Sequence, residues 1–115
     1  MADSVSAYFS FLQKQPDIAR MFALESFDGE FEPGDTEQEL QASGIAFVKQ
    51  LQSSGVIRDD LDAGMALAAF NALIEHWFIS QERVAKLNKK RIGPSLDASY
   101  LDAIQKILSG GLQPS

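Results

Sequence analysis

The residues best equipped for chemistry stand together in the tetrapeptide Glu75-His76-Trp77-Phe78. A carboxylate and an imidazole can serve as general acid or base, but adjacent residues point to different faces of a helix and do not form a catalytic pair by themselves. The chain has no cysteine, and no serine has a spacing typical of a nucleophile beside a base. We therefore predict that the protein is not an enzyme. An enzyme that uses Glu75 or His76 as a general base is the weaker hypothesis.

Aromatic residues favour a second kind of chemistry, a pocket for a small molecule. The chain holds eight phenylalanines and one tryptophan, and apolar walls with a few orienting polar groups are typical of ligand sites. The wall candidates are Met21, Phe22, Phe47, Phe70, Trp77 and Phe78, with Asn71, Glu75 or His76 as the polar groups. Taken one residue at a time, a plain aromatic core with His76 at an interface is the favoured interpretation; the number of aromatic residues taken together keeps the pocket hypothesis open.

Two clusters of charge could also bind a partner. Seven acids lie between Glu25 and Glu39, and hard cations such as calcium take oxygen ligands. The spacing does not fit an EF-hand loop, so we favour a solvated loop. Five cations lie from Arg83 to Arg91. Because no aromatic residues are interleaved with them, we favour a solvated helix end that complements the helix dipole over a nucleic-acid site. A pairing of these cations with the acidic loop is a further alternative.

Composition excludes several classes of function. Among 115 residues there are 16 acidic and 10 basic side chains, for a net charge of −6, which opposes DNA binding by this chain. The absence of cysteine excludes disulfides, and a single histidine excludes a multi-histidine metal centre; we expect no metal and no cofactor. Neither a secretory signal nor a membrane-spanning run is present, so we expect a cytoplasmic protein with no membrane partner.

The elements that must position these residues are all helices. Apolar residues recur at helical spacing, as in Val5, Tyr8, Phe9 and Leu12. Thr36 and Glu39 form a capping box that opens the third helix, and Gly110-Gly111 ends the fifth. No stretch alternates as a strand does. We predict a single all-α domain over 1–115 with helices at about 3–14, 16–27, 36–54, 60–87 and 95–109.

The fourth helix is apolar on every face, so it needs cover on several sides. Gly64, Ala68 and Ala72 lie four residues apart and allow another helix to approach closely. These features indicate that the C-terminal half forms a dimer interface.

Three runs resemble TetR-type transcriptional regulators. The run from Tyr8 to Glu25 is similar to their aromatic-x-x-Leu-x-x-x-Pro-x-Leu-Ala-Arg segment, and Gly55-Val56-Ile57-Arg58-Asp59-Asp60-Leu61-Asp62 resembles their junction into the first dimer helix. The run from Tyr100 to Leu112 is like their last helix with its terminal Gly-Leu. The resemblance spans most of the chain through loose motifs.

This resemblance implies a domain that dimerises as a four-helix bundle through its last two long helices, here 60–87 and 95–109. It implies that a small hydrophobic or amphipathic ligand binds between the helices and releases DNA from a repressor. The implied ligand-binding residues are Phe22, Phe47, Phe70, Asn71, Trp77 and Phe78. The implied interface residues of the homodimer are Leu61, Met65, Ala68, Ala72, His76, Leu101, Ile104 and Leu108.

The family's N-terminal helix-turn-helix domain is absent from this sequence. We therefore expect DNA to be a partner only through such a domain, whether the chain is an excised effector domain or a stand-alone relative. A stand-alone helical protein that binds small molecules, unrelated to transcription, is the alternative.

Overall fold

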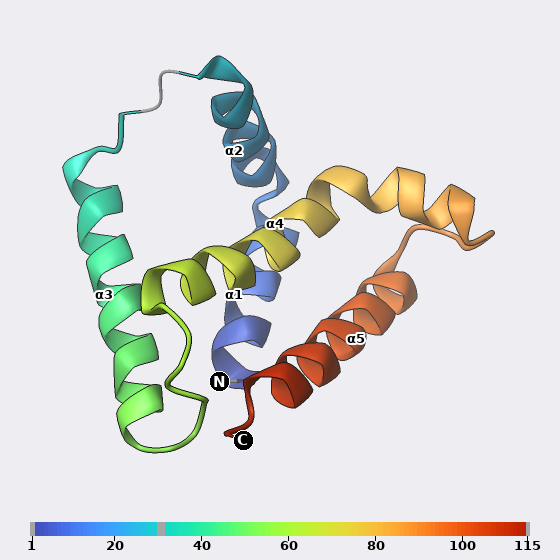
Figure 1. Cartoon of the computed structure of the whole chain (residues 1–115). Coiled ribbons are helices and arrows are strands. Elements are labelled where there is room, and N and C mark those ends of the chain that lie inside the picture. Colours follow the sequence, from blue (N-terminus) through green and yellow to red (C-terminus); the bar gives the residue numbers. More distant parts are fainter. Residues whose placement is uncertain (1, 30–31, 115) are drawn as a thin grey trace.

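Five helices form the structure, a computed structural model that describes residues 2–29 and 32–114 (Figure 1). The sequence-based prediction of an all-α chain is confirmed, and the described residues contain no strand. The helices are α1 (Ala2–Lys14), α2 (Pro16–Asp28), α3 (Asp35–Ser53), α4 (Ala63–Leu87) and α5 (Pro94–Leu112). In Figure 1, α4 crosses the middle of the molecule, with α2 above it and α3 at the left, beside its N-terminal end.

Local sequence explains where most of these helices begin and end. Pro16 occupies the first turn of α2, and Gly29 closes that helix in the left-handed conformation, at φ 74°. The Asp62 side chain caps α4 by accepting a hydrogen bond from the Met65 N–H at 2.9 Å. These residues stabilise the helix ends through local contacts and local backbone conformation, without contacts from distant parts of the chain.

The predicted capping box and the predicted glycine stop are wrong. α3 begins at Asp35 with Gly34 as its N-cap, and no side chain caps it, so Thr36 lies inside the first turn rather than at the start of a capping box. α5 continues through Gly110-Gly111 to Leu112. The Leu112 side chain is buried, and its carbonyl oxygen accepts a hydrogen bond from the Arg58 N–H at 2.7 Å. This contact with a distant loop outweighs the helix-breaking tendency of two glycines, about 1 kcal/mol each.

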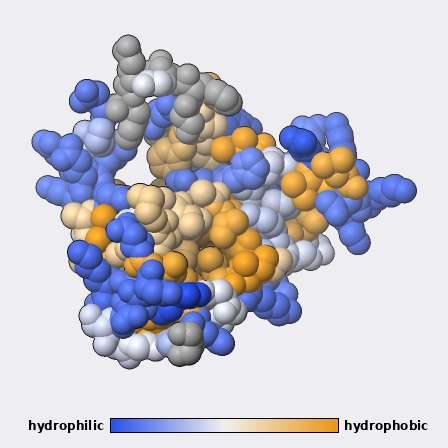
Figure 2. All heavy atoms as spheres, in the orientation of Figure 1, coloured by the Kyte–Doolittle hydropathy of each residue, from blue (hydrophilic) through white to orange (hydrophobic). Residues whose placement is uncertain are grey.

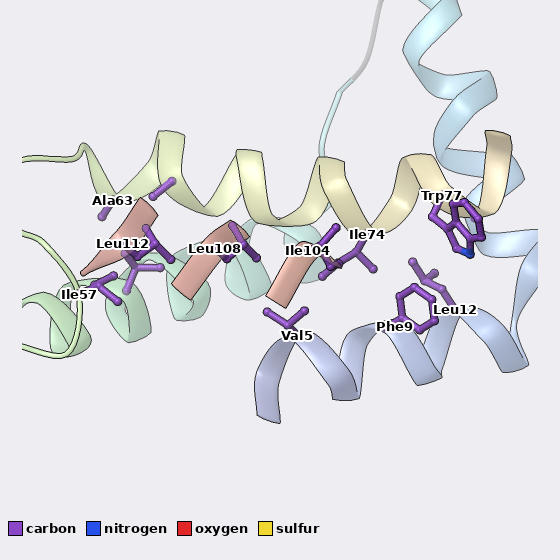
Figure 3. Close-up of a cluster of buried hydrophobic side chains, with 13 residues drawn as sticks. Val5, Phe9, Leu12, Ile57, Ala63, Ile74, Trp77, Ile104, Leu108 and Leu112 are labelled. Carbon is purple, nitrogen blue, oxygen red and sulfur yellow. The ribbon is translucent and has the colours of Figure 1, made fainter. Parts of the chain in front are cut away.

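The core forms where α1, α4 and α5 meet (Figure 3). The apolar stripe of α1 supplies Val5, Phe9 and Leu12, all at most 4% exposed. The other helices and the loop before α4 add Ile57, Ala63, Ile74, Trp77, Ile104, Leu108 and Leu112. Burial of side chains of this size stabilises the fold by about 1.5–3 kcal/mol each, so the core fixes α4 against α1 and α5.

Small residues bring α3 close to α4. A Cβ atom at Gly44 would lie 2.7 Å from Leu67 Cδ2, and one at Gly64 would lie 3.7 Å from Ile45 Cδ1. Of the predicted strip of small residues, only Gly64 therefore faces another helix of the chain. Ala68 and Ala72 are exposed to solvent.

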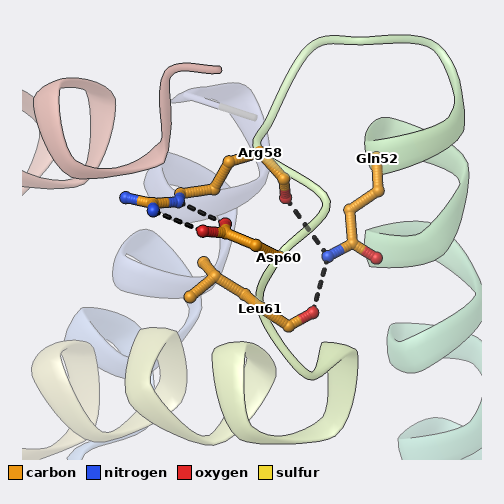
Figure 4. A network of polar contacts seen from close by, with 4 residues as sticks. All are labelled: Gln52, Arg58, Asp60 and Leu61. Atoms are coloured by element: carbon orange, nitrogen blue, oxygen red, sulfur yellow. Dashed lines mark hydrogen bonds and ion pairs between the residues drawn. The ribbon is translucent and has the colours of Figure 1, made fainter. Parts of the chain in front are cut away.

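A polar network holds the loop between α3 and α4 (Figure 4). The Gln52 side-chain amide donates hydrogen bonds to the carbonyl oxygens of Arg58, at 3.3 Å, and Leu61, at 2.9 Å. The Arg58 guanidinium forms a two-point ion pair with Asp60. These contacts keep residues 58–61 out of the helix, so α4 begins at Ala63, three residues later than the sequence predicts.

None of the described helices is both long and apolar enough to cross a membrane.

Candidate functional site

An open cleft of about 890 Å³ lies among α1, α2, α3 and α4. Figure 2 shows the molecule hollowed between α2 and α3. Apolar and aromatic side chains supply most of its lining, with a small number of amides and carboxylates. The lining residues are Tyr8, Phe11, Ile18, Phe22, Glu25, Gly29, Glu37, Leu40, Gln41, Gly44, Leu67, Asn71 and Glu75. A hollow of this size and composition is typical of a site for a small molecule.

A hydrogen-bonded pair lies on the wall of the cleft where α1 meets α4. The Tyr8 hydroxyl donates to Glu75 Oε1 at 2.7 Å, and both side chains are half-buried. Burial, followed by the hydrogen bond to Glu75 and its negative charge, raises the pKa of Tyr8 well above its ordinary value. Burial also raises the pKa of Glu75, and the hydrogen bond from Tyr8 offsets part of that rise. The cleft thus contains a carboxylate whose charge is only partly compensated.

The charges at the cleft are all of one sign. Its described lining holds three carboxylates, Glu25, Glu37 and Glu75, and no lysine, arginine or histidine. Arg20, on the same helix as Glu25, forms an ion pair with Asp17 at 3.3 Å and borders a different hollow. The cleft is therefore an aromatic-walled, negatively charged site.

Four of the six predicted ligand-binding residues lie at or beside this cleft. Phe22 and Asn71 line it directly. Phe47 and Phe70 line a smaller cavity of about 110 Å³ that shares Asn71 with the cleft. Phe78 lies elsewhere: its ring packs 4.9 Å from that of Phe9, and it borders a separate hollow between α2 and α4.

Trp77 is a core residue that lines none of these three hollows. Its side chain is 1% exposed and stacks on Tyr100 at 4.4 Å between ring centroids. Its indole N–H donates to Asp97 Oδ1 at 2.9 Å, and Asp97 Oδ2 accepts from the Gln13 amide at 3.0 Å. The Tyr100 hydroxyl donates to the Leu73 carbonyl oxygen. Trp77 therefore ties α4 to α5 rather than forming a wall of the cleft.

The predicted interface residues divide into two sets. The exposed set lies on one stripe of α4 and just before it and comprises Leu61, Met65, Ala68, Ala72 and His76. Figure 2 shows hydrophobic residues over the middle of α4. The second set lies on α5, where Ile104 and Leu108 are 2% and 8% exposed inside the chain's own core and Leu101 is half-buried. Ile104 and Leu108 turn inward because α5 packs on α1 and α4.

The two charged clusters show no built site. Among the described residues, no three acidic or histidine side chains are close enough to hold a metal ion; Glu30 and the side chain of Asp28 lie outside the described residues. In the basic cluster, Lys86 pairs with Glu82 at 3.1 Å on the exposed surface of α4. Exposed pairs of this kind contribute little to stability.

Sequence reasoning missed Tyr8 and the α3 residues Leu40 and Gln41 as lining of the cleft. Tyr8 falls on the apolar stripe of α1 and was indistinguishable from a core residue. Its hydroxyl was the available signal, because a buried tyrosine usually finds a hydrogen-bond partner. Glu75, the only acid between Ala63 and Gln81, was the natural candidate for that partner.

Comparison with protein-family models, with curated proteins and with solved structures finds no match to this chain.

Proposed function

We propose that this chain is the effector-sensing and dimerisation domain of a TetR-like transcriptional regulator, a repressor, and binds a small hydrophobic or amphipathic ligand in the cleft. One observation carries the proposal: the surface of α4 divides into three faces with different surroundings. Trp77 and Ile74 face the core, Leu67 and Asn71 face the cleft, and Ala72 faces solvent. This division accounts for a helix that is apolar all round.

The exposed stripe of α4 supports the homodimer. Met65 is 69% exposed and Ile79 is 47% exposed, with Ala68, Ala72 and the imidazole of His76 on the same face. Small residues between larger apolar ones let a second helix approach closely, and a contiguous apolar stripe is a typical protein contact surface. We propose that two copies of the chain pack through this stripe, with α5 beside it completing a four-helix bundle.

The same helix would couple the ligand to the dimer. A ligand that touches Leu67, Asn71 and Glu75 contacts α4 about a third of a turn from the exposed stripe, at roughly 100° per residue. A shift of α4 therefore reaches the partner subunit directly. DNA would be read by a helix-turn-helix domain and not by this acidic chain, which carries a net charge of −6.

A thermal-shift screen of hydrophobic metabolites tests the ligand site. A ligand at 100 times its Kd stabilises the folded state by about 2.7 kcal/mol. Gln41→Trp should weaken this stabilisation, because position 41 lines the cleft and the indole would obstruct part of it. Gln50→Trp, an exposed position on the same helix, is the matched control and should respond as the wild type does. Equal stabilisation of both variants by every hit would contradict the site.

A charged substitution on the exposed stripe tests the dimer. Ala72→Glu should yield a folded monomer, because the side chain is solvent-exposed in the single chain but would bury an unpaired charge in the dimer, at a cost of several kcal/mol. Ala46→Glu, on an exposed position of α3, adds the same charge elsewhere and should leave the dimer intact. A wild type that is already a monomer would contradict the proposed dimer.

A further inference from the structure

The charge and ring content of the cleft indicate the chemistry of its ligand. Aromatic rings line it from two helices: Tyr8 and Phe11 lie on α1, with centroids 6.5 Å apart in a stacked arrangement, and Phe22 lies on α2. A cation within about 6 Å of a ring face is attracted by the negative face of the ring. Rings in this setting suit a cationic ligand and offer no such attraction to an anion.

The carboxylates select in the same direction. Glu75 is half-buried against Tyr8, which donates to only one of its oxygens, and an ionised carboxylate can accept about four hydrogen bonds. Burial raises the pKa of Glu75, so its charged form lacks full compensation without a ligand. Glu25 and Glu37 add negative charge from α2 and α3, and no basic side chain is among the described lining.

We propose that the cleft binds an amphipathic cation, in which a positive group meets the Glu75 carboxylate and an apolar body packs against Tyr8, Phe11 and Phe22. This inference rests on the proposed ligand-binding function and adds the class of ligand to it. Glu75 is the main counter-charge because it is half-buried and held in place on the wall of the cleft by the Tyr8 hydroxyl. The exposed Glu37 is screened by solvent and salt and contributes less.

Two probes of nearly equal shape and opposite charge test the inference. Isothermal titration calorimetry of the full chain with tetraphenylphosphonium, a cation, and tetraphenylborate, an anion, separates charge from apolar burial. A neutral third probe, triphenylphosphine oxide, reports binding without a net charge. We expect the cation to bind at least about tenfold more tightly than the anion. Equal affinities, or tighter binding of the anion, would overturn the inference.

A matched pair of variants locates the charge effect. Glu75→Gln keeps an acceptor oxygen for the Tyr8 hydroxyl and should weaken cation binding about tenfold without weakening the binding of the neutral probe. Glu39→Gln removes the same charge from an exposed position on α3 outside the cleft lining and should change neither affinity. If both variants weaken cation binding equally, the attraction comes from the net charge of the chain, and the inference is wrong. Circular dichroism melts of both variants verify that they fold.

The outcomes distinguish this inference from the proposed function. Binding of all three probes with equal affinity, weakened by Gln41→Trp, would keep the ligand site and refute its preference for cations. If no probe binds and the metabolite screen also gives no ligand whose binding Gln41→Trp weakens, both proposals are contradicted.

Discussion

Replacement of Asp97 by alanine should destabilise the domain, because this carboxylate links three helices. Its carboxylate accepts hydrogen bonds from Trp77 Nε1 at 2.9 Å and Gln13 Nε2 at 3.0 Å, and so joins α5 to α4 and α1. Asp97→Ala leaves the N–H of an indole that is 1% exposed without its acceptor, at a cost of about 1–3 kcal/mol. Loss of the negative charge from the first turn of α5 adds about 0.3–1 kcal/mol.

The sum is about 1–4 kcal/mol, a large share of the 5–15 kcal/mol typical of a domain, and corresponds to a Tm lower by roughly 5–20 °C. Urea denaturation followed by Trp77 fluorescence measures it. Asp102→Ala, which removes an exposed carboxylate paired with Lys106 at 2.9 Å on the same helix, is the control and should cost less than about 0.5 kcal/mol. If Asp97→Ala costs no more than this control, the three-helix bridge does not stabilise the fold as argued.

Three further substitutions follow from the same packing. Trp77→Ala should cost about 3–5 kcal/mol, because it empties a fully buried site; a loss under about 1 kcal/mol in urea denaturation would contradict its place in the core. Gly44→Leu should cost about 1–3 kcal/mol by overpacking, since a Cβ there already meets Leu67 at 2.7 Å, and an unchanged Tm would show that α3 yields. Tyr8→Phe should raise the pKa of Glu75 further by removing its donor. A raised folded-state pKa lowers stability as pH rises from the ordinary value of about 4.3 through the folded value, so the loss should be larger at pH 8 than at pH 4, and equal losses would refute the coupling.

Helix positions were predictable from sequence because they depend on local patterns. The stripe of α1, Pro16 at the start of α2 and the long apolar run of α4 each determine an element within a few residues. The errors in the predicted helix ends arise where a contact with a distant part of the chain determines the end of the helix. Gly110-Gly111 stays helical because Leu112 reaches the core and meets the loop at Arg58, which no window of local sequence contains.

The candidate site was predictable only in part, for the same reason. Phe22 and Asn71 were identified as aromatic and polar candidates, and they do line the cleft. Tryptophan is also a typical wall residue of ligand sites, so residue type alone did not show where Trp77 lies. Its indole N–H donates a hydrogen bond to Asp97, 20 residues further along the chain, and its ring is buried in the core. Tyr8 and Glu75 are separated by 67 residues, so their pairing required the packing of α1 on α4.

The mass of the chain in solution tests the central claim most directly. An effector domain that dimerises through the exposed stripe of α4 should sediment at equilibrium, at tens of micromolar protein, with about twice the chain mass of 12.6 kDa. The same experiment on Ala72→Glu should return the mass of one chain. A wild-type protein that sediments at 12.6 kDa across this range would contradict the account.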